Sequence, residues 1–105
     1  MRSESMEIKL KKNKFDGLIN GTKKSTSRLG HREVNIGEEL VIKMTENEKI
    51  SYSGNVTGVK YCKFSELTEE EAIAEGYNNL AELKENLTNI YNPSADDEFT
   101  LIYFE

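Results

Sequence analysis

Cysteine, histidine and proline each occur only once among the 105 residues of this chain, and tryptophan is absent. Because Cys62 is the single cysteine, no disulfide can form within the chain, and a reducing compartment fits best. One cysteine and the single histidine, His31, are too few for a metal-ligand cluster. A catalytic cysteine would also need a histidine nearby. We therefore expect Cys62 to be a packed or half-exposed thiol and the protein to use no metal.

Long apolar runs are missing as well. No segment approaches the roughly 18 apolar residues of a membrane span, and the opening segment MRSESMEIKLKK lacks the apolar core of a signal peptide. The sequence has no internal repeat or low-complexity segment, and its one proline, Pro93, leaves little room for a linker. We expect a single domain over residues 1–105, soluble and cytoplasmic, with no membrane partner.

The charges are divided unevenly along the chain. Residues 1–32 hold nine Lys and Arg against three acidic residues, whereas the net charge of the whole chain is -5. An acidic protein is a poor candidate for tight nonspecific binding to duplex DNA. A local basic face for one nucleotide or a short RNA segment is compatible with this distribution. A solvated basic N-terminal region that balances acidic helices explains it equally well.

The residue pattern predicts short strands and helices in alternation. β-Branched, aromatic and alternating residues predict strands over 6–10, 38–44, 50–62 and 99–105. Gly54 and Gly58 predict a bulge or a close backbone approach in the third of these. Apolar residues at helical spacing predict a short helix over 13–20 and a longer one over 78–91: Phe15, Leu18 and Ile19 in the first, and Leu80, Leu83, Leu87 and Ile90 in the second.

Residue types at helix ends support these predictions. Thr68 followed by Glu71 forms a capping box that starts a further helix, which ends at Glu75 and Gly76. Gly21 suits the left-handed position after the first helix. Residues 21–28 are then expected to form a loop. Helices interrupt an otherwise antiparallel set of strands, so the fold class is α+β with a small curved sheet or barrel.

The segment GTKKSTSR, residues 21–28, concentrates two lysines, three hydroxyl residues and an arginine. Three interpretations stay open from the residues alone: a solvated turn, a loop that binds an anion, or part of an active site. In an extended segment Thr26 and Arg28 point to one side, and the long side chain of Lys23 can reach over them.

Lysine beside threonine is a useful chemical pair. A threonine hydroxyl is a weak nucleophile until a base takes its proton. Lysine can be that base only if its pKa falls from about 10.4 toward 7–8, through burial or nearby positive charge. Lys24 and Arg28 would supply such charge. Glu75 is a candidate proton donor because the end of a helix disfavours negative charge, although on spacing alone it belongs to the surface of a Glu-rich helix.

Three segments together resemble the ASCH domain, a member of the PUA-like β-barrel superfamily. FDGLINGTKKSTSR is similar to its short helix followed by Gly-x-Lys-x-x-(Glu or Thr)-x-Arg, here Gly21, Lys23, Thr26 and Arg28. NIGEELVIKM resembles its strand entry, and LTEEEAIAEGYNNLAELKENLTNIY with FTLIYFE resembles its paired helices and closing strand. The resemblance covers about residues 12–105. It implies one PUA-like domain with a small curved mixed sheet or barrel and short helices.

Thr at the sixth motif position resembles the small bacterial N4-acetylcytidine amidohydrolases, which deacetylate the exocyclic amide of acetylated cytidine. The resemblance implies Lys23 as proton acceptor, Thr26 as nucleophile and Glu75 as proton donor, with no metal or organic cofactor. Arg28 would stabilise an oxyanion or fix the geometry of the pocket. Gly21, Lys24 and Tyr77 complete the expected substrate-binding set, with Tyr77 either stacked on a pyrimidine or packed in the core.

Other functions fit the same residues. PUA-like domains often bind RNA, and in that case Lys23, Lys24 and Arg28 would contact phosphate while Thr26 caps a turn. Either Lys23 or Lys24 is also a possible base, although Lys23 has the matching spacing to Gly21 and Thr26. A domain that works only through a protein partner is a third possibility.

Overall fold

The computed structural model describes residues 5–105, so the first four residues of the expected domain, including the basic Arg2, lie outside it. The elements follow one another in the order β1 (Ser5–Leu10), α1 (Lys12–Asn20), β2 (Ser25–Leu29), β3 (Glu39–Met44), β4 (Asn47–Lys63), a 3₁₀ helix (Phe64–Glu66), α2 (Glu69–Ala74), α3 (Leu80–Tyr91) and β5 (Glu98–Phe104). Every predicted strand and helix is present, within a few residues of the expected bounds.

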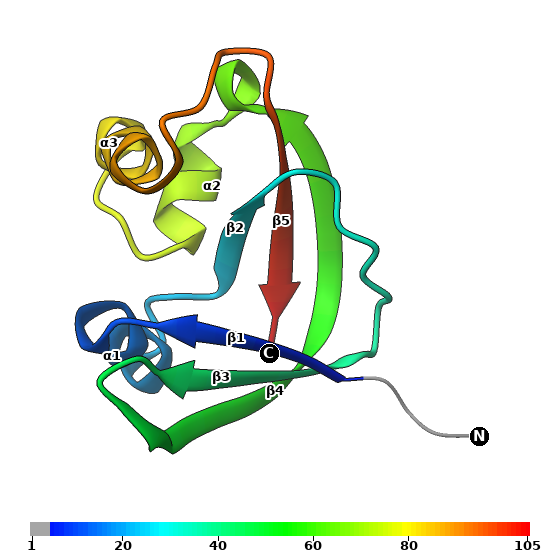
Figure 1. The fold of residues 1–105 in the computed structure, drawn as a ribbon, viewed down its shortest axis with the longest axis vertical. Helices are drawn as coiled ribbons and strands as arrows, with labels where there is room; N and C mark the ends of the chain where they lie inside the picture. The colour runs from blue at the N-terminus through cyan, green and yellow to red at the C-terminus, as the bar shows by residue number, and fades with distance from the viewer. Residues whose placement is uncertain (1–4) are drawn as a thin grey trace.

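The five strands form one strongly curled sheet in the order β1-β3-β4-β5-β2 (Figure 1). The long strand β4 pairs with β3 through its first half and with β5 through its second half. Its register shifts between Val56 and Gly58, close to where Gly58 predicted a bulge. This shift lies where β4 passes from one partner to the other, and it lets the sheet curl.

The expectation of purely antiparallel pairing is wrong for β1. This strand pairs in parallel with β3, from Ser5 opposite Glu39 to Leu10 opposite Met44. The other three strand pairs are antiparallel. Because α1 and β2 intervene between β1 and β3, the chain has room for the long crossover that a parallel pair requires. The sheet is therefore mixed, as the resemblance to the ASCH domain implied.

Residues 21–28 are also not simply a loop. Ser25–Leu29 form the edge strand β2, which pairs with β5 from Ser25 opposite Tyr103 to Leu29 opposite Phe99. Polar residues fill most of this strand, so it lacks the apolar alternation that marks the others. The partner strand, not the local sequence, makes the segment extended.

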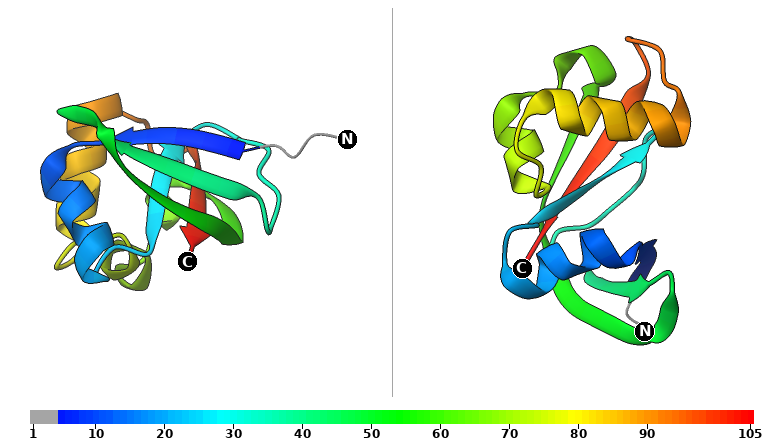
Figure 2. Two further views of the ribbon diagram at one scale, coloured as in Figure 1. Left: turned by 90° about the horizontal axis from the view of Figure 1, so that it is seen from below. Right: turned by 90° about the vertical axis from the view of Figure 1, so that its left-hand side faces the viewer.

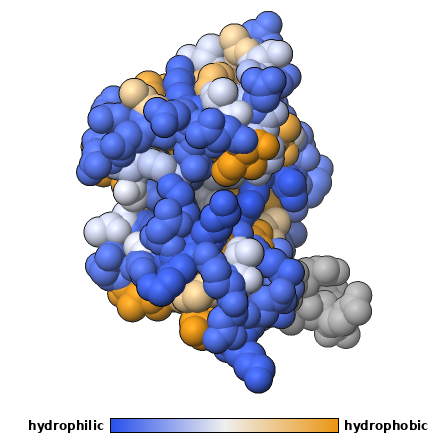
Figure 3. Space-filling model, turned by 60° about the vertical axis from the view of Figure 1, so that its left-hand side comes forward, coloured by the Kyte–Doolittle hydropathy of each residue, from blue (hydrophilic) through white to orange (hydrophobic). Residues whose placement is uncertain are grey.

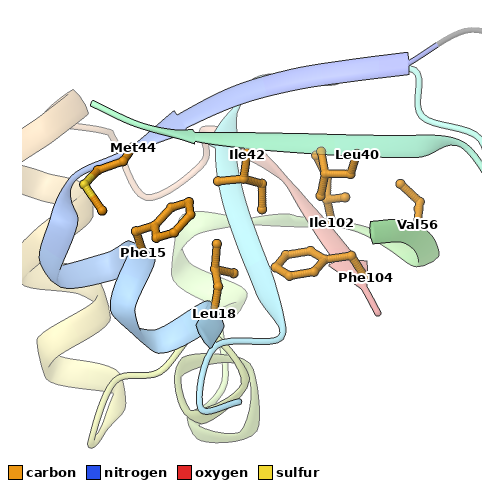
Figure 4. Close-up of a cluster of buried hydrophobic side chains, with 8 residues drawn as sticks. All are labelled: Phe15, Leu18, Leu40, Ile42, Met44, Val56, Ile102 and Phe104. Atoms are coloured by element: carbon orange, nitrogen blue, oxygen red, sulfur yellow. The ribbon is translucent and has the colours of Figure 1, made fainter. Parts of the chain in front are cut away.

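Two apolar clusters lie on the two sides of β5. In the first, Phe15 and Leu18 of α1 pack against β3 and the C-terminal part of β5 (Figure 4). The second joins β5 to α2 and α3, through buried residues such as Ala72 and Leu83. Ile19 and Ile90, which were expected on the apolar helix faces, are instead 68% and 61% exposed.

The helix ends follow the expected residues. Thr68 and Glu71 form the capping box of α2, Asn79 caps α3, and Gly21 adopts φ 83° after α1. The strand β2 lies between the helices, with α1 on one side of it and the pair α2 and α3 on the other (Figure 2, right). Among the described residues, no helix is long and apolar enough to cross a membrane.

Candidate active site

The backbone of the basic segment is held between α1 and α2. The Lys23 N–H donates to the carbonyl oxygen of Gly17 in α1 over 3.0 Å, and the Lys24 N–H donates to that of Ala74 in α2 over 2.6 Å. These two bonds place the side chains of neighbouring lysines in different surroundings. Lys23 is buried, whereas Lys24 is exposed to solvent.

The end of α2 brings Glu75 to the same place. The N–H groups of Gly76 and Tyr77 donate to the carbonyls of Ile73 and Ala72, the bonding pattern of a Schellman motif. Gly76 adopts φ 94°, which a residue with a Cβ adopts only at a cost. The helix therefore stops at Glu75, which is only 5% exposed despite its place in a Glu-rich segment.

Lys23 and Glu75 form a buried pair. Lys23 Nζ lies 3.7 Å from Glu75 Oε1, and it also donates to the main-chain oxygen of Glu75 over 3.3 Å. The pKa of Lys23 is lowered to about 8. Burial is the largest cause, Lys14 and Arg28 act in the same direction, and the attraction of Glu75 opposes them. Thus Lys14, rather than the exposed Lys24, adds to the effect expected of Arg28.

Burial also raises the pKa of Glu75, against the opposing effects of Lys23 and a hydrogen bond from Ser27. Burial, and not the helix end invoked from the sequence, is the main cause of this shift. A lysine that loses its proton at a lower pH than usual therefore faces a carboxyl group that keeps its proton to a higher pH than usual. These are the protonation tendencies that a general base and a general acid need near neutral pH.

Two of the three hydroxyl residues of β2, Thr26 and Ser27, lie on opposite faces of the strand. Thr26 pairs with Ile102, which belongs to the first apolar cluster, whereas Ser27 pairs with Leu101, which belongs to the second. Ser27 Oγ donates a hydrogen bond to Glu75 Oε2. Thr26 Oγ1 makes no hydrogen bond within residues 5–105. The sequence pattern did not indicate Ser27, because strand alternation becomes visible only once residues 25–29 are known to be a strand.

These side chains share one cavity of about 670 Å³, within the usual range of small-molecule sites. It opens beside β2, between α1 and α3, on a face that is mainly hydrophilic (Figure 3). The expected site residues that line it are Lys23, Thr26, Arg28, Glu75 and Tyr77, together with Ser27.

Tyr77 is held in place at the cavity wall. Its hydroxyl donates to Asn86 Oδ1 over 2.7 Å, and Lys14 Nζ lies 3.6 Å from the centroid of its ring. The ring also packs against the second apolar cluster, and burial raises the pKa of its hydroxyl. Of the two expected roles, packing is the one visible here, since Lys14 occupies a face on which a base would stack.

Gly21 and Lys24 are not brought to this cavity. Both line a different cavity of about 470 Å³ on the other side of the segment. A third cavity, of about 690 Å³, lies against the acidic first turn of α2. Its lysine, Lys60, is already paired with Glu71, and its threonine, Thr68, caps the helix. Of the three cavities, the one at β2 combines a base, an acid and an unbonded hydroxyl.

The other chemical groups considered from the sequence lie apart from this cavity. Cys62 is buried in the second apolar cluster. His31 stacks on Tyr61 with ring centroids 4.1 Å apart and contacts Glu98. No group of three or more His, Cys, Asp or Glu able to hold a metal ion occurs in residues 5–105.

The fold is that of ASCH domains. An ASCH domain from Lactobacillus crispatus superposes with a TM-score of 0.80 at 17% identity, covering 95% of this chain and 79% of that one. The ASCH protein from Zymomonas mobilis gives a TM-score of 0.70 at 11% identity, covering 94% of this chain and 65% of that one. The Enterococcus faecalis protein EF3133 gives 0.72 at 16% identity, covering 100% and 82%. The sequence itself matches no family model and no curated protein.

Proposed function

We propose that this protein hydrolyses the acyl group from the exocyclic amide of a modified nucleoside, such as N4-acetylcytidine, giving cytidine and acetate. The observation that carries this proposal is one cavity lined by the buried pair of Lys23 and Glu75 and by Thr26, whose hydroxyl makes no hydrogen bond within residues 5–105. The sequence resemblance to the N4-acetylcytidine amidohydrolases supplies the substrate class.

In the first step neutral Lys23 accepts the proton of Thr26 Oγ1. The oxygen then attacks the acetyl carbonyl and forms a tetrahedral intermediate. Because the pKa of Lys23 is lowered to about 8, a substantial fraction of this lysine is neutral at mildly alkaline pH. Once protonated, Lys23 places a positive charge beside the developing oxyanion. Groups of this kind are worth about 3 kcal/mol of barrier.

In the second step Glu75 gives its proton to the exocyclic nitrogen, the C–N bond breaks and cytidine leaves. Thr26 now carries the acetyl group as an ester. A water molecule then gives a proton to the Glu75 carboxylate and attacks this ester. As acetic acid leaves, Thr26 Oγ1 takes back the proton held by Lys23, so every group returns to its starting state. The acid then loses its proton to solvent as acetate.

Ser27 has a supporting role in this scheme. Its hydroxyl donates to Glu75 Oε2, which holds the carboxyl group in one orientation and stabilises its ionised form. That ionised form is the product of the second step. Ser27 therefore acts through Glu75 and is a positioning residue.

The test is to incubate the purified protein with N4-acetylcytidine and follow cytidine by chromatography. Release of cytidine that disappears in Thr26→Ala and Lys23→Ala supports the proposal, provided both variants keep the circular dichroism spectrum of the wild type. Lys24→Ala is the matched control, because its side chain points to a different cavity. A folded wild-type protein that releases no cytidine would contradict this substrate assignment.

Binding of RNA without catalysis is the second candidate, favoured by the basic residues within 1–32 that line this cavity and the one beside Lys24. An RNA-binding surface should lose affinity steeply with added salt. It should also weaken to a similar extent when either Lys23 or Lys24 is removed. An amidohydrolase should instead depend on Lys23 and Thr26 and respond little to salt.

A further inference from the structure

The cavity at β2 is strongly basic although the whole chain is acidic. Its wall contains five basic side chains and one acidic side chain, that of Glu75. The five are Lys9, Lys11, Lys14, Lys23 and Arg28. The chain as a whole has a net charge of -5. A cleft lined by one sign of charge attracts ligands of the opposite sign, yet an uncharged nucleoside gains nothing from such a field.

Several of these cations already have a partner. Lys23 pairs with Glu75, Lys9 Nζ lies 3.2 Å from Glu48, and Lys14 lies over the ring of Tyr77. Arg28 is different. Within residues 5–105 it makes no ion pair, and its Nε and Nη2 are buried without a hydrogen-bond partner.

Those two nitrogens form one edge of the guanidinium group, with their N–H bonds directed the same way. This edge matches two oxygens of a phosphate or carboxylate, which bind it through two parallel hydrogen bonds. Buried donors without partners carry a desolvation cost. Arg28 lines the cavity wall, so an anion bound there would remove that cost once the side chain turns this edge toward it.

The position of Arg28 separates this anion from the reacting group. Thr26 and Arg28 alternate with Ser27 along β2, so they share a face of the strand and lie about 7 Å apart along it. An anion bound by Arg28 therefore lies away from the reacting carbonyl. A nucleotide has this arrangement, because its phosphate and the exocyclic amide of its base are at opposite ends of the molecule.

We infer that the cavity takes its substrate as a nucleoside monophosphate, with the unpaired edge of Arg28 as the phosphate site and Lys9, Lys11 and Lys14 as the surrounding positive field. This inference rests on the proposed function for the identity of the base and its acyl group. The phosphate site itself rests on the charges of the cavity and on Arg28.

Binding of the reaction products tests the phosphate site without any need for turnover. Titration calorimetry should show cytidine 5′-monophosphate binding at least about tenfold more tightly than cytidine, with a preference that shrinks as salt is added. Arg28→Met should abolish the preference. Arg28→Lys, which keeps the charge but loses the paired donors, should restore only part of it.

Lys12→Met is the matched control. Lys12 is on α1 beside the cavity, but it pairs with Asp16 and does not line the wall. Its removal should leave the preference unchanged. Equal binding of the two products by the wild type, or a preference that survives in folded Arg28→Met, would overturn the inference.

Turnover separates the two proposals. We expect kcat/KM to be at least about tenfold higher for N4-acetylcytidine 5′-monophosphate than for N4-acetylcytidine. Equal turnover of both, with equal binding of both products, would overturn the phosphate site and leave the amidohydrolase proposal standing. Tight monophosphate binding without any turnover would support the phosphate site and overturn the amidohydrolase proposal. Activity confined to acetylcytidine within an RNA oligonucleotide would overturn the monophosphate in favour of RNA.

Discussion

Lys23 and Glu75 are 52 positions apart in the sequence, yet Lys23 Nζ lies 3.7 Å from Glu75 Oε1 and both side chains are at most 5% exposed. Burial lowers the pKa of the lysine and raises that of the carboxyl group, so it narrows the gap between the two values. A proton can then move between this pair and a substrate at little cost.

The rate should report the titration of Lys23. Because its pKa is lowered to about 8, the neutral base is present above that pH and is lost as the pH falls through it. We expect kcat/KM for N4-acetylcytidine to rise with pH to a midpoint near 8. Loss of the proton from Glu75, whose pKa is raised by burial, sets the falling limb.

The charged groups that act on Lys23 give a further check on this profile. They are Glu75, which raises its pKa, and Lys14 and Arg28, which lower it. Lys14→Met should therefore move the rising limb of the pH–rate profile to higher pH. A limb that stays in place in this variant would show that another group is the base.

Removing the carboxylate should destabilise the fold in a pH-dependent manner. In Glu75→Gln the buried Lys23 loses its partner, and breaking such pairs costs about 3–5 kcal/mol. The folded-state pKa of Lys23 lies below the unfolded value, so the penalty for its charged form is full at low pH and shrinks as the pH rises through the folded value. Urea unfolding at pH 6 and pH 9 measures this difference.

A double variant provides the comparison. Lys23→Met combined with Glu75→Leu removes both charges, and we expect its free energy of unfolding to be close to that of the wild type or above it. A double variant that is as unstable as Glu75→Gln alone would indicate that packing, not charge, explains the loss.

Removal of the Thr26 hydroxyl and removal of the Ser27 hydroxyl should have unequal effects on turnover. Thr26→Ala removes the proposed nucleophile, so we expect a loss of at least about 10³-fold in kcat, with partial activity in Thr26→Ser. Ser27→Ala should cost roughly tenfold, because it removes only the hydrogen bond to Glu75.

The pH–rate profile separates the roles of Thr26 and Ser27. In Ser27→Ala the falling limb of the pH profile should move to higher pH, because its hydrogen bond lowers the pKa of Glu75. Complete loss of activity in Ser27→Ala together with an active Thr26→Ala would assign the attack to Ser27.

Gly76 should matter for activity as well as stability. Its φ of 94° is unfavourable for other residues, so Gly76→Ala should cost about 1–2 kcal/mol of unfolding free energy and displace Glu75. Gly30 has φ 93° and lies outside the cavity, so Gly30→Ala is the control. Similar stability losses in both, with turnover reduced only in Gly76→Ala, are expected from urea titrations and kinetics.

Much of the fold could be predicted because its signals are local. The capping box of Thr68 and Glu71 and the cap at Asn79 act through bonds between residues three apart. The strands other than β2 have enough β-branched and aromatic residues to be recognised by themselves. Parallel pairing of β1 and the extended form of β2 were missed, since each depends on a partner strand far along the chain.

For the candidate site, the sequence by itself determined which reactive residues are present and the spacing of Lys23, Thr26 and Arg28. It favoured Lys23 over Lys24 only by spacing, placed Glu75 on the surface of a helix, and gave no sign that Ser27 belongs to the site. Only the tertiary structure decided these points, because burial and the face of a strand depend on what packs against it. The pKa values follow the same rule: desolvation is the largest cause at Lys23 and at Glu75, and α1, β2 and α2 together produce it.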